Sequence, residues 1–204
     1  IMHLYHHPYS ASARRAVMTA IHLDLPVELV TVDLTNLQQR RQLTELNANS
    51  KVPVLQDGEF ILWESCAIMQ YLADKTPKQT IYPADVRVRA DINRWLLWAS
   101  QHFGPALGIL VWENMMKAMY GVGTPDAREL ERGQIQIEQF AQVLDEHLRG
   151  RDWICGPGVT IADFAVATPL MYMEQARLPL QQYAHIQAWF DRVQQLDAWK
   201  RTAF

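Results

Sequence analysis

The sequence has little cysteine and no long apolar run. Its only two cysteines, Cys66 and Cys155, lie far apart and form no CxxC pair. This spacing argues against a disulfide framework and against a thiolate zinc site. No apolar stretch reaches the length of a membrane span, and the first residues lack the basic-then-apolar pattern of a secretory signal. We therefore expect a protein of the reducing cytoplasm that has no membrane partner.

A strong excess of charge is also missing. Nineteen Lys and Arg residues stand against 22 Asp and Glu, and no basic run could neutralise a row of phosphates, so we do not expect nucleic acid as a partner. His3, His6 and His7 have no accompanying carboxylate, and strand geometry spreads them over two faces, so we expect no metal site there. The length and the 49% hydrophobic content allow one large domain or two small ones.

Strand and helix signals alternate along the first third of the chain. Short apolar or β-branched runs predict strands, and apolar residues at three- and four-residue intervals predict helices. Two apolar runs around Asp57-Gly58 predict a hairpin, because this pair tolerates positive φ. The predicted order is β-α-β-α-β-β-α, with elements at 2–5, 13–21, 27–33, 37–46, 51–63 for the hairpin, and 68–72.

Strand signals end after a polar, proline-containing stretch, and the rest of the chain reads as helical. We expect an α/β domain at 1–76, a linker at 77–86 and an all-helical domain at 87–204. Pro105 should kink a helix without ending it. Thr160 and Asp163 have the spacing of an acidic capping box, so we interpret both as structural.

Ser10 and Ser12 lie where the first strand runs into the first helix. A helix start presents backbone N–H groups and a partial positive charge, which favour an anion. Redox proteins of this topology carry CxxC here, whereas this chain has Ser10-Ala11-Ser12-Ala13, which excludes disulfide exchange by its own thiols at this place. A purely structural interpretation, in which Ser12 or Ser10 caps the helix, stays open.

Several motifs in order resemble the cytosolic glutathione S-transferase family along nearly the whole chain. They are LYHHPYSAS, NANSKVPVL and LWESCAIMQYL in the first domain, and TIADF and AWFDRV in the second. The resemblance is to the serine-using theta, delta and bacterial branches. It implies a thioredoxin-like first domain, glutathione as cosubstrate, a cytoplasmic homodimer and a role in detoxification.

The resemblance assigns roles to residues of the first domain. Ser10 is the candidate donor to the glutathione thiolate, with Ser12 as the alternative. The backbone of Val52, before a cis Pro53, pairs with the cysteinyl unit. The remaining implied contacts are Glu64 with the ammonium and Ser65 with the carboxylate of the γ-glutamyl end, and Lys51 with the glycyl carboxylate.

Two glutamines depart from the family pattern. Gln39 or Gln38 falls where theta-like relatives carry histidine or lysine, and Gln101 aligns with an acidic position that can approach glutathione. We expect both regions to take part in glutathione binding. Two arginines, Arg14 and Arg15, lie at the start of the first helix. A cation gains nothing from the helix dipole there, so we expect one of them to form an ion pair with a tertiary partner.

The second substrate should meet an apolar stripe that follows Gln101 at helical spacing. The stripe consists of Pro105, Ile109, Trp112 and Met116, and Tyr9 is a further candidate contact of the second substrate. The alternative is that the stripe is core between domains. The resulting hypothesis is conjugation of glutathione to small hydrophobic electrophiles, without a metal. Its rivals are glutathione-dependent reduction of disulfides or peroxides at the same site, and a non-catalytic binding or scaffold protein of the same fold.

Overall fold

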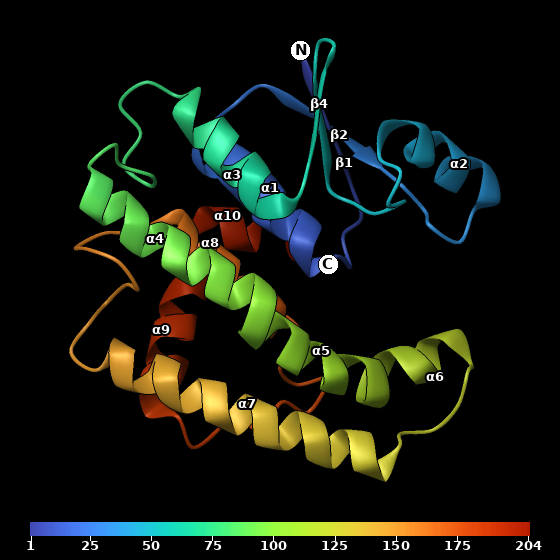
Figure 1. Ribbon diagram of the computed structural model, residues 1–204, viewed down its shortest axis with the longest axis vertical. Coiled ribbons are helices and arrows are strands. Elements are labelled where there is room, and N and C mark those ends of the chain that lie inside the picture. Colours follow the sequence, from blue (N-terminus) through green and yellow to red (C-terminus); the bar gives the residue numbers. More distant parts are fainter. The chain divides into compact units, whose positions relative to one another are not determined.

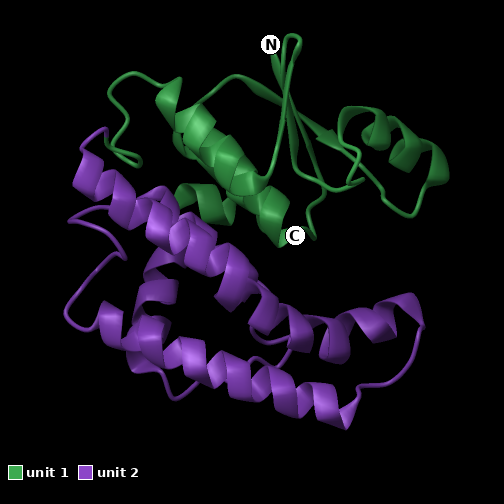
Figure 2. Cartoon of the chain, in the orientation of Figure 1, with its two compact units in different colours: residues 1–83, 195–204 green, residues 84–194 purple.

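The computed structural model describes residues 1–204 and divides the chain into two compact units. Unit 1 holds residues 1–83 and 195–204, and unit 2 holds residues 84–194 (Figure 2). The predicted domains differ from these units at the C-terminus, since 195–204 had been placed in the helical domain. This segment belongs to unit 1 because Arg14 donates to the carbonyl oxygen of Trp199 at 2.9 Å and stacks on the Trp199 ring at 3.7 Å.

Unit 1 combines a four-stranded sheet with four helices (Figure 1). Its elements are β1 (Met2–His6), α1 (Ala11–His22), β2 (Val27–Thr31), α2 (Leu37–Leu46), β3 (Val54–Asp57), β4 (Phe60–Trp63), α3 (Ser65–Asp74) and α10 (Asp197–Lys200). The strand order is β2-β1-β3-β4, with β1 parallel to β2 and antiparallel to β3, and β3 antiparallel to β4. The predicted β-α-β-α-β-β-α order and the thioredoxin-like fold are confirmed. In the hairpin the loop residues are Gly58 and Glu59, one position later than predicted, because Asp57 pairs with Phe60.

Helices α1 and α3 lie on one face of the sheet, and α2 lies on the other (Figure 1). Leu4 and Leu55 from the strands share a buried cluster with Ile68 and Leu72 of α3. Leu43 of α2 belongs to a second cluster. Each such side chain contributes about 1.5–3 kcal/mol when it is fully buried. This packing fixes the starts of α1 and α3 against the sheet.

Unit 2 is entirely helical, as predicted. Its elements are α4 (Val86–Trp98), η1 (Ala99–Phe103), α5 (Gly104–Val111), η2 (Trp112–Met116), α6 (Lys117–Tyr120), α7 (Ala127–Leu148), α8 (Ile161–Ala167), η3 (Thr168–Leu170) and α9 (Ala184–Gln194). The segments η1 and η2 are π-helical turns, and η3 is a 3-10 turn. None of the helices is both long enough and apolar enough to cross a membrane.

The helical run from α4 continues past Pro105, and a π turn precedes it. The Gly104 N–H bonds to the carbonyl oxygen of Ala99, five residues back. Pro105 has no N–H, so it tolerates a place where the regular hydrogen-bond ladder is interrupted. A Cβ on Gly104 would lie 2.7 Å from the Ala99 oxygen. Glycine is therefore required for this irregularity.

Candidate active site

Three loops of unit 1 leave the sheet at the same edge. Tyr5 of β1 pairs with Val54 of β3, and Val54 pairs with Trp63 of β4. The end of β1, the beginning of β3 and the end of β4 are therefore neighbours. The register collects predicted site residues from all three loops: Ser10 after β1, Val52 and Pro53 before β3, and Glu64 and Ser65 after β4.

Ser10 is the N-cap residue of α1. Its Oγ accepts a hydrogen bond from the Ala13 N–H at 3.0 Å, and its own N–H donates to the His7 carbonyl oxygen at 2.9 Å. This is the structural role that the sequence left open. A serine hydroxyl that accepts from a backbone N–H still carries its own proton and can donate it. Ser12 is exposed in the first turn of α1 and is not the cap residue.

The loop before β3 contains the cis peptide bond between Val52 and Pro53 that the resemblance implies. Both residues are buried, whereas Lys51 is exposed. The side chain of Asn47 shapes the loop, since its Nδ2 donates to the Lys51 carbonyl oxygen at 2.9 Å and its Oδ1 accepts from the Asn49 N–H at 3.0 Å. The hydrogen bonds of the Asn47 side chain thus hold the loop in its conformation, and the exposed Lys51 lies at its surface.

Glu64 begins α3 with an unusual backbone. Its φ is +75°, and its side chain makes no capping hydrogen bond to the helix. Positive φ is rare for a residue other than glycine and costs about 1–3 kcal/mol. The first N–H groups of a helix have no partner within the helix, and here the N-cap side chain supplies none either. This helix start is suited to receive an anion.

Ser65, the first residue of α3, is buried, and its Oγ accepts a hydrogen bond from the Arg15 guanidinium at 3.3 Å. Arg15 is also buried, and burial lowers its pKa, while the nearby Cys66 and Glu64 raise it. A tertiary partner is confirmed for both arginines, but these hydrogen bonds go to hydroxyl and carbonyl oxygens and not to the carboxylate that an ion pair requires. Arg14 anchors the C-terminal segment, whereas Arg15 ties α1 to the start of α3.

Gln39 is half-buried on α2, and Gln38 is exposed. The Gln39 Oε1 accepts from the Asp33 N–H at 2.8 Å, in the loop that follows β2. This bond points the amide toward the loop between β2 and α2. The Nε2 group of an amide with an occupied oxygen still has two protons to donate.

The candidates in unit 2 share one helical run but differ in environment. Gln101 in η1 and Pro105 in α5 are exposed. Ile109 lies against α7, since a Cβ on Gly133 would come within 2.9 Å of its side chain. This contact lies within unit 2, so it shows that Ile109 packs inside the helical unit and does not bear on the interpretation of the stripe as core between domains. Trp112 is 42% exposed, and Met116 is half-buried four residues further along.

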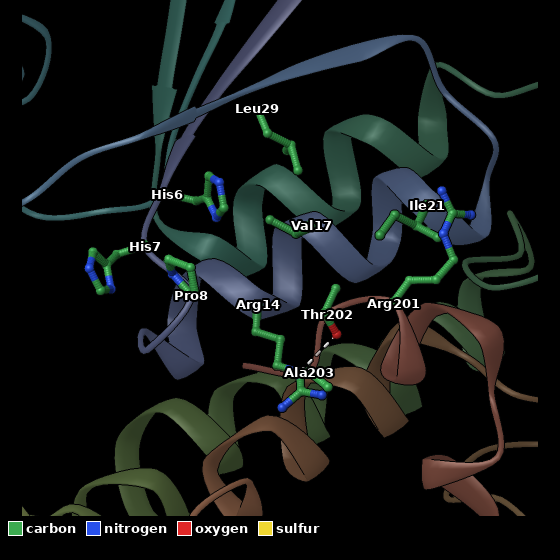
Figure 3. Close-up of a pocket in the computed structure, with 10 residues that line it drawn as sticks. All are labelled: His6, His7, Pro8, Arg14, Val17, Ile21, Leu29, Arg201, Thr202 and Ala203. Atoms are coloured by element: carbon green, nitrogen blue, oxygen red, sulfur yellow. Dashed lines mark hydrogen bonds between the residues drawn. The ribbon is translucent and has the colours of Figure 1, made fainter.

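Tyr9 is half exposed and lies beside the C-terminal segment within unit 1. Its ring packs edge-on against Phe204, with centroids 5.4 Å apart, and also contacts His7. A cavity of about 130 Å³ lies beside residues 6–8, which lead to Tyr9. It is bounded by α1, β2 and the C-terminal residues (Figure 3). The side chains of His6, His7, Arg14 and Arg201 line it, together with apolar residues. It contains none of the predicted glutathione contacts.

Two family models match the chain. The model "Glutathione S-transferase, N-terminal domain" covers residues 1–74, and "Glutathione S-transferase, C-terminal domain" covers residues 127–192. Glutathione S-transferase theta-2 of Rattus norvegicus is 31% identical over 201 residues, which are 98% of this chain and 79% of that protein. The chain belongs to the glutathione S-transferase family.

Other glutathione S-transferases and related proteins match over similar lengths. Dichloromethane dehalogenase of Methylorubrum extorquens is 28% identical and matches 94% of this chain and 70% of that protein. A delta-class glutathione transferase of Nilaparvata lugens superposes with a TM-score of 0.86 at 26% identity, covering all of this chain and 93% of that one. The predicted resemblance to theta-like and delta-like relatives agrees with these matches.

Two residues that shape the candidate site were not among the predicted site residues. Asn47 stood in a quoted motif, and its burial and its bond to the Lys51 oxygen show that it shapes the loop before Pro53. Arg15 was only expected to find some partner, and the sequence did not indicate Ser65. A cation at the start of a helix, where the dipole disfavours it, was the one available signal.

Proposed function

We propose that this chain conjugates the thiol of glutathione to small hydrophobic electrophiles. The observation that carries the proposal is the sheet register, which gathers Ser10, the Val52-Pro53 bond and the Glu64-Ser65 pair at one edge. Membership in the glutathione S-transferase family supports the same chemistry. The proposal needs no metal, and no cluster of three or more His, Cys, Asp or Glu side chains is arranged to hold one.

The chemical task is to stabilise a thiolate. A free thiol has a pKa of about 8.5 and is mostly protonated at neutral pH. The Ser10 hydroxyl accepts a hydrogen bond from the Ala13 N–H and donates a hydrogen bond to the glutathione sulfur, whose own proton passes to solvent. A hydrogen bond to a charged atom contributes about 1.5–3 kcal/mol, enough to lower the thiol pKa by about one to two units. The thiolate then attacks the electrophile, the S–C bond forms, and the leaving group departs with its electron pair.

The rest of glutathione binds along the same edge. The backbone of Val52 pairs with the cysteinyl unit, and Lys51 faces the glycyl carboxylate. At the other end Glu64 meets the γ-glutamyl ammonium, while Ser65 at the open start of α3 takes the carboxylate. Gln39 and Gln101 supply additional polar contacts, weaker than those of charged side chains at the same places.

The electrophile requires an apolar surface, for which Tyr9, Pro105, Trp112 and Met116 are the candidates. Trp112 contributes a large exposed ring that suits an aromatic acceptor. Ile109 contributes less, because part of it packs on α7. We further infer a cytoplasmic homodimer that acts in detoxification, as is typical of the family.

A pair of activities tests this function. The protein should be retained by immobilised glutathione and should turn over an activated aryl halide with glutathione faster than it reduces a small disulfide. Faster disulfide reduction would reassign the site to glutathione-dependent reduction. Failure to bind glutathione at all would favour the non-catalytic alternative. The Ser10→Ala variant should lose most of the conjugating activity. The Ser12→Ala variant is its matched control, because this serine is exposed on the same turn, and a loss of conjugation in Ser12→Ala alone would reassign the thiolate donor to Ser12.

A further inference from the structure

Arg14 and Arg15 are adjacent and equally buried, each with 5% of its surface exposed, but they bind different parts of unit 1. Arg14 donates to the Thr202 hydroxyl and the Trp199 carbonyl oxygen, each at 2.9 Å, and so anchors the C-terminal segment. Arg15 donates to the Ser65 hydroxyl at 3.3 Å, at the start of α3. A buried guanidinium is costly unless it is well paired, so each position demands a specific partner arrangement.

The bond from Arg15 fixes the direction in which Ser65 can donate. The Ser65 oxygen accepts from the guanidinium, so its own proton points elsewhere and is available to an acceptor at the helix start. Hydrogen bonds in series polarise one another, and a positive charge behind the hydroxyl strengthens its donation. An anionic acceptor gains most from this relay.

The surroundings make a carboxylate the best occupant. The N-cap side chain of α3 leaves the helix start open, so an anion there also meets the positive end of the helix dipole. Because Arg15 is buried, solvent screens its charge less than it screens a surface cation. Glu64 is exposed beside this place and suits an ammonium group.

We propose that Arg15 is a positioning residue that acts through the Ser65 hydroxyl to select thiol peptides with an α-carboxylate on their γ-glutamyl end. This inference rests on the proposed function, since it assumes that glutathione binds at the start of α3. What it adds to the contact between Ser65 and this carboxylate is Arg15, the residue behind Ser65 on which discrimination against thiols without the carboxylate depends. Arg15 touches neither the thiol nor the electrophile, so it should not affect the chemical step.

The test compares glutathione with 4-aminobutyryl-cysteinylglycine, the same peptide without the γ-glutamyl α-carboxylate. Wild-type protein should bind glutathione about 10- to 100-fold more tightly than the analogue, as measured by calorimetry. The Arg15→Gln variant should reduce this preference to about threefold or less, since the charged relay is lost. Its kcat at saturating glutathione should stay within about twofold of wild type, because the thiolate donor is untouched.

Arg14→Gln is the matched control, because it removes an equally buried arginine from the same helix and should keep the full preference. If Arg15→Gln does not fold, Arg15→Lys replaces it and should lower the preference at least threefold, since an ammonium does not reproduce the guanidinium geometry. The inference is overturned if Arg15→Gln keeps the wild-type preference for glutathione over the analogue. The same holds for Arg15→Lys where it replaces Arg15→Gln. Equal binding of both peptides by wild type also overturns it while leaving glutathione binding intact, whereas no binding of glutathione refutes the proposed function itself.

Discussion

Two helices of this protein, α8 in unit 2 and α3 in unit 1, begin in opposite ways. At the start of α8 the Thr160 Oγ1 accepts from the Ala162 N–H, and the Asp163 carboxylate accepts from the Thr160 N–H at 2.9 Å. At the start of α3 the cap residue Glu64 has a φ of +75° and makes no side-chain cap bond. The first helix start is closed by its own side chains, and the second is left open.

Under the proposed function, the start of α3 is a place where the chain gives up stability and leaves N–H groups for a ligand. A side-chain cap contributes about 1 kcal/mol, and positive φ at a residue other than glycine costs about 1–3 kcal/mol. The start of α3 therefore lacks the stabilisation of a side-chain cap and also carries the cost of a positive φ. Its first N–H groups are left without a side-chain cap and can bind a ligand. Helix α1 is intermediate, because Ser10 caps it and keeps a proton to donate.

The largest expected effect is the loss of stability when the capping box at the start of α8 is removed. Asp163 is fully buried and accepts from the N–H groups of Thr160 and Ile154 and from the Trp189 ring at 2.8 Å. Asp163→Ala leaves three buried donors without their acceptor, so we expect about 3–5 kcal/mol of destabilisation in urea unfolding. The exposed cap Asp85→Ala should cost only about 1 kcal/mol. An effect of similar size at both positions would contradict this account of the capping box.

The same carboxyl predicts a pH dependence. Burial raises the pKa of Asp163 from 3.8 to about 6. The folded state therefore holds the proton more tightly than the unfolded state, and this group's contribution to the free energy of unfolding decreases as the pH rises from about 4 to 6. The loss is at most about 3 kcal/mol. In Asp163→Asn the free energy of unfolding should no longer decrease in this way between about pH 4 and 6. An identical dependence on pH in wild type and Asp163→Asn would show that the pKa of Asp163 is not raised.

The next largest expected effect is the loss of activity in two Ser10 variants, which separate the role of this serine as helix cap from its role as thiolate donor. Ser10→Gly removes the hydroxyl but keeps most of the capping preference, whereas Ser10→Ala loses both. We expect kcat/KM for glutathione conjugation to fall about 10- to 100-fold in each variant, with only Ser10→Ala also losing about 1 kcal/mol of stability. If the alanine variant loses activity and the glycine variant retains it, the hydroxyl acts only as a cap.

The smallest effect concerns the backbone of the open start. Glu64→Gly relieves the positive φ, so we expect a gain of about 1 kcal/mol in stability together with weaker glutathione binding. Glu64→Gln keeps the backbone and removes the charge, so its binding should weaken without the gain in stability. Unfolding in urea and calorimetric titration of both variants measure the two effects. A glycine variant no more stable than the glutamine variant would show that the backbone at this position is not strained.

Hydrophobic periodicity, together with the Asp57-Gly58 turn signal, was enough to predict the strands and helices of residues 1–83 in order, because each strand and helix buries one face. Helix α10 of the same unit was not predicted. The Asp57-Gly58 turn was off by one position, since strand pairing rather than turn preference sets the loop. The affiliation of residues 195–204 was not predicted, because it depends on Arg14 reaching Trp199 across a long sequence separation. Periodicity carries no information about such contacts.

The candidate site was predictable as far as motifs reach. Ser10, Pro53, Glu64 and Ser65 occupy one sheet edge as their motifs imply, although their roles remain to be tested. The bond between Arg15 and Ser65 could not be predicted, since no local signal links residues on two different helices. Likewise, the contact of Ile109 with α7 depends on a glycine on a distant helix.

The measurement that most directly tests the central claim is the ultraviolet thiolate absorbance of glutathione, titrated with pH on saturating wild-type protein and on Ser10→Gly. Our account predicts a bound-thiol pKa about one to two units below the free value of about 8.5 in wild type, returning toward it in the variant. A bound thiol with an unshifted pKa in wild type, or an equal shift in both proteins, would contradict the assignment of Ser10 as thiolate donor.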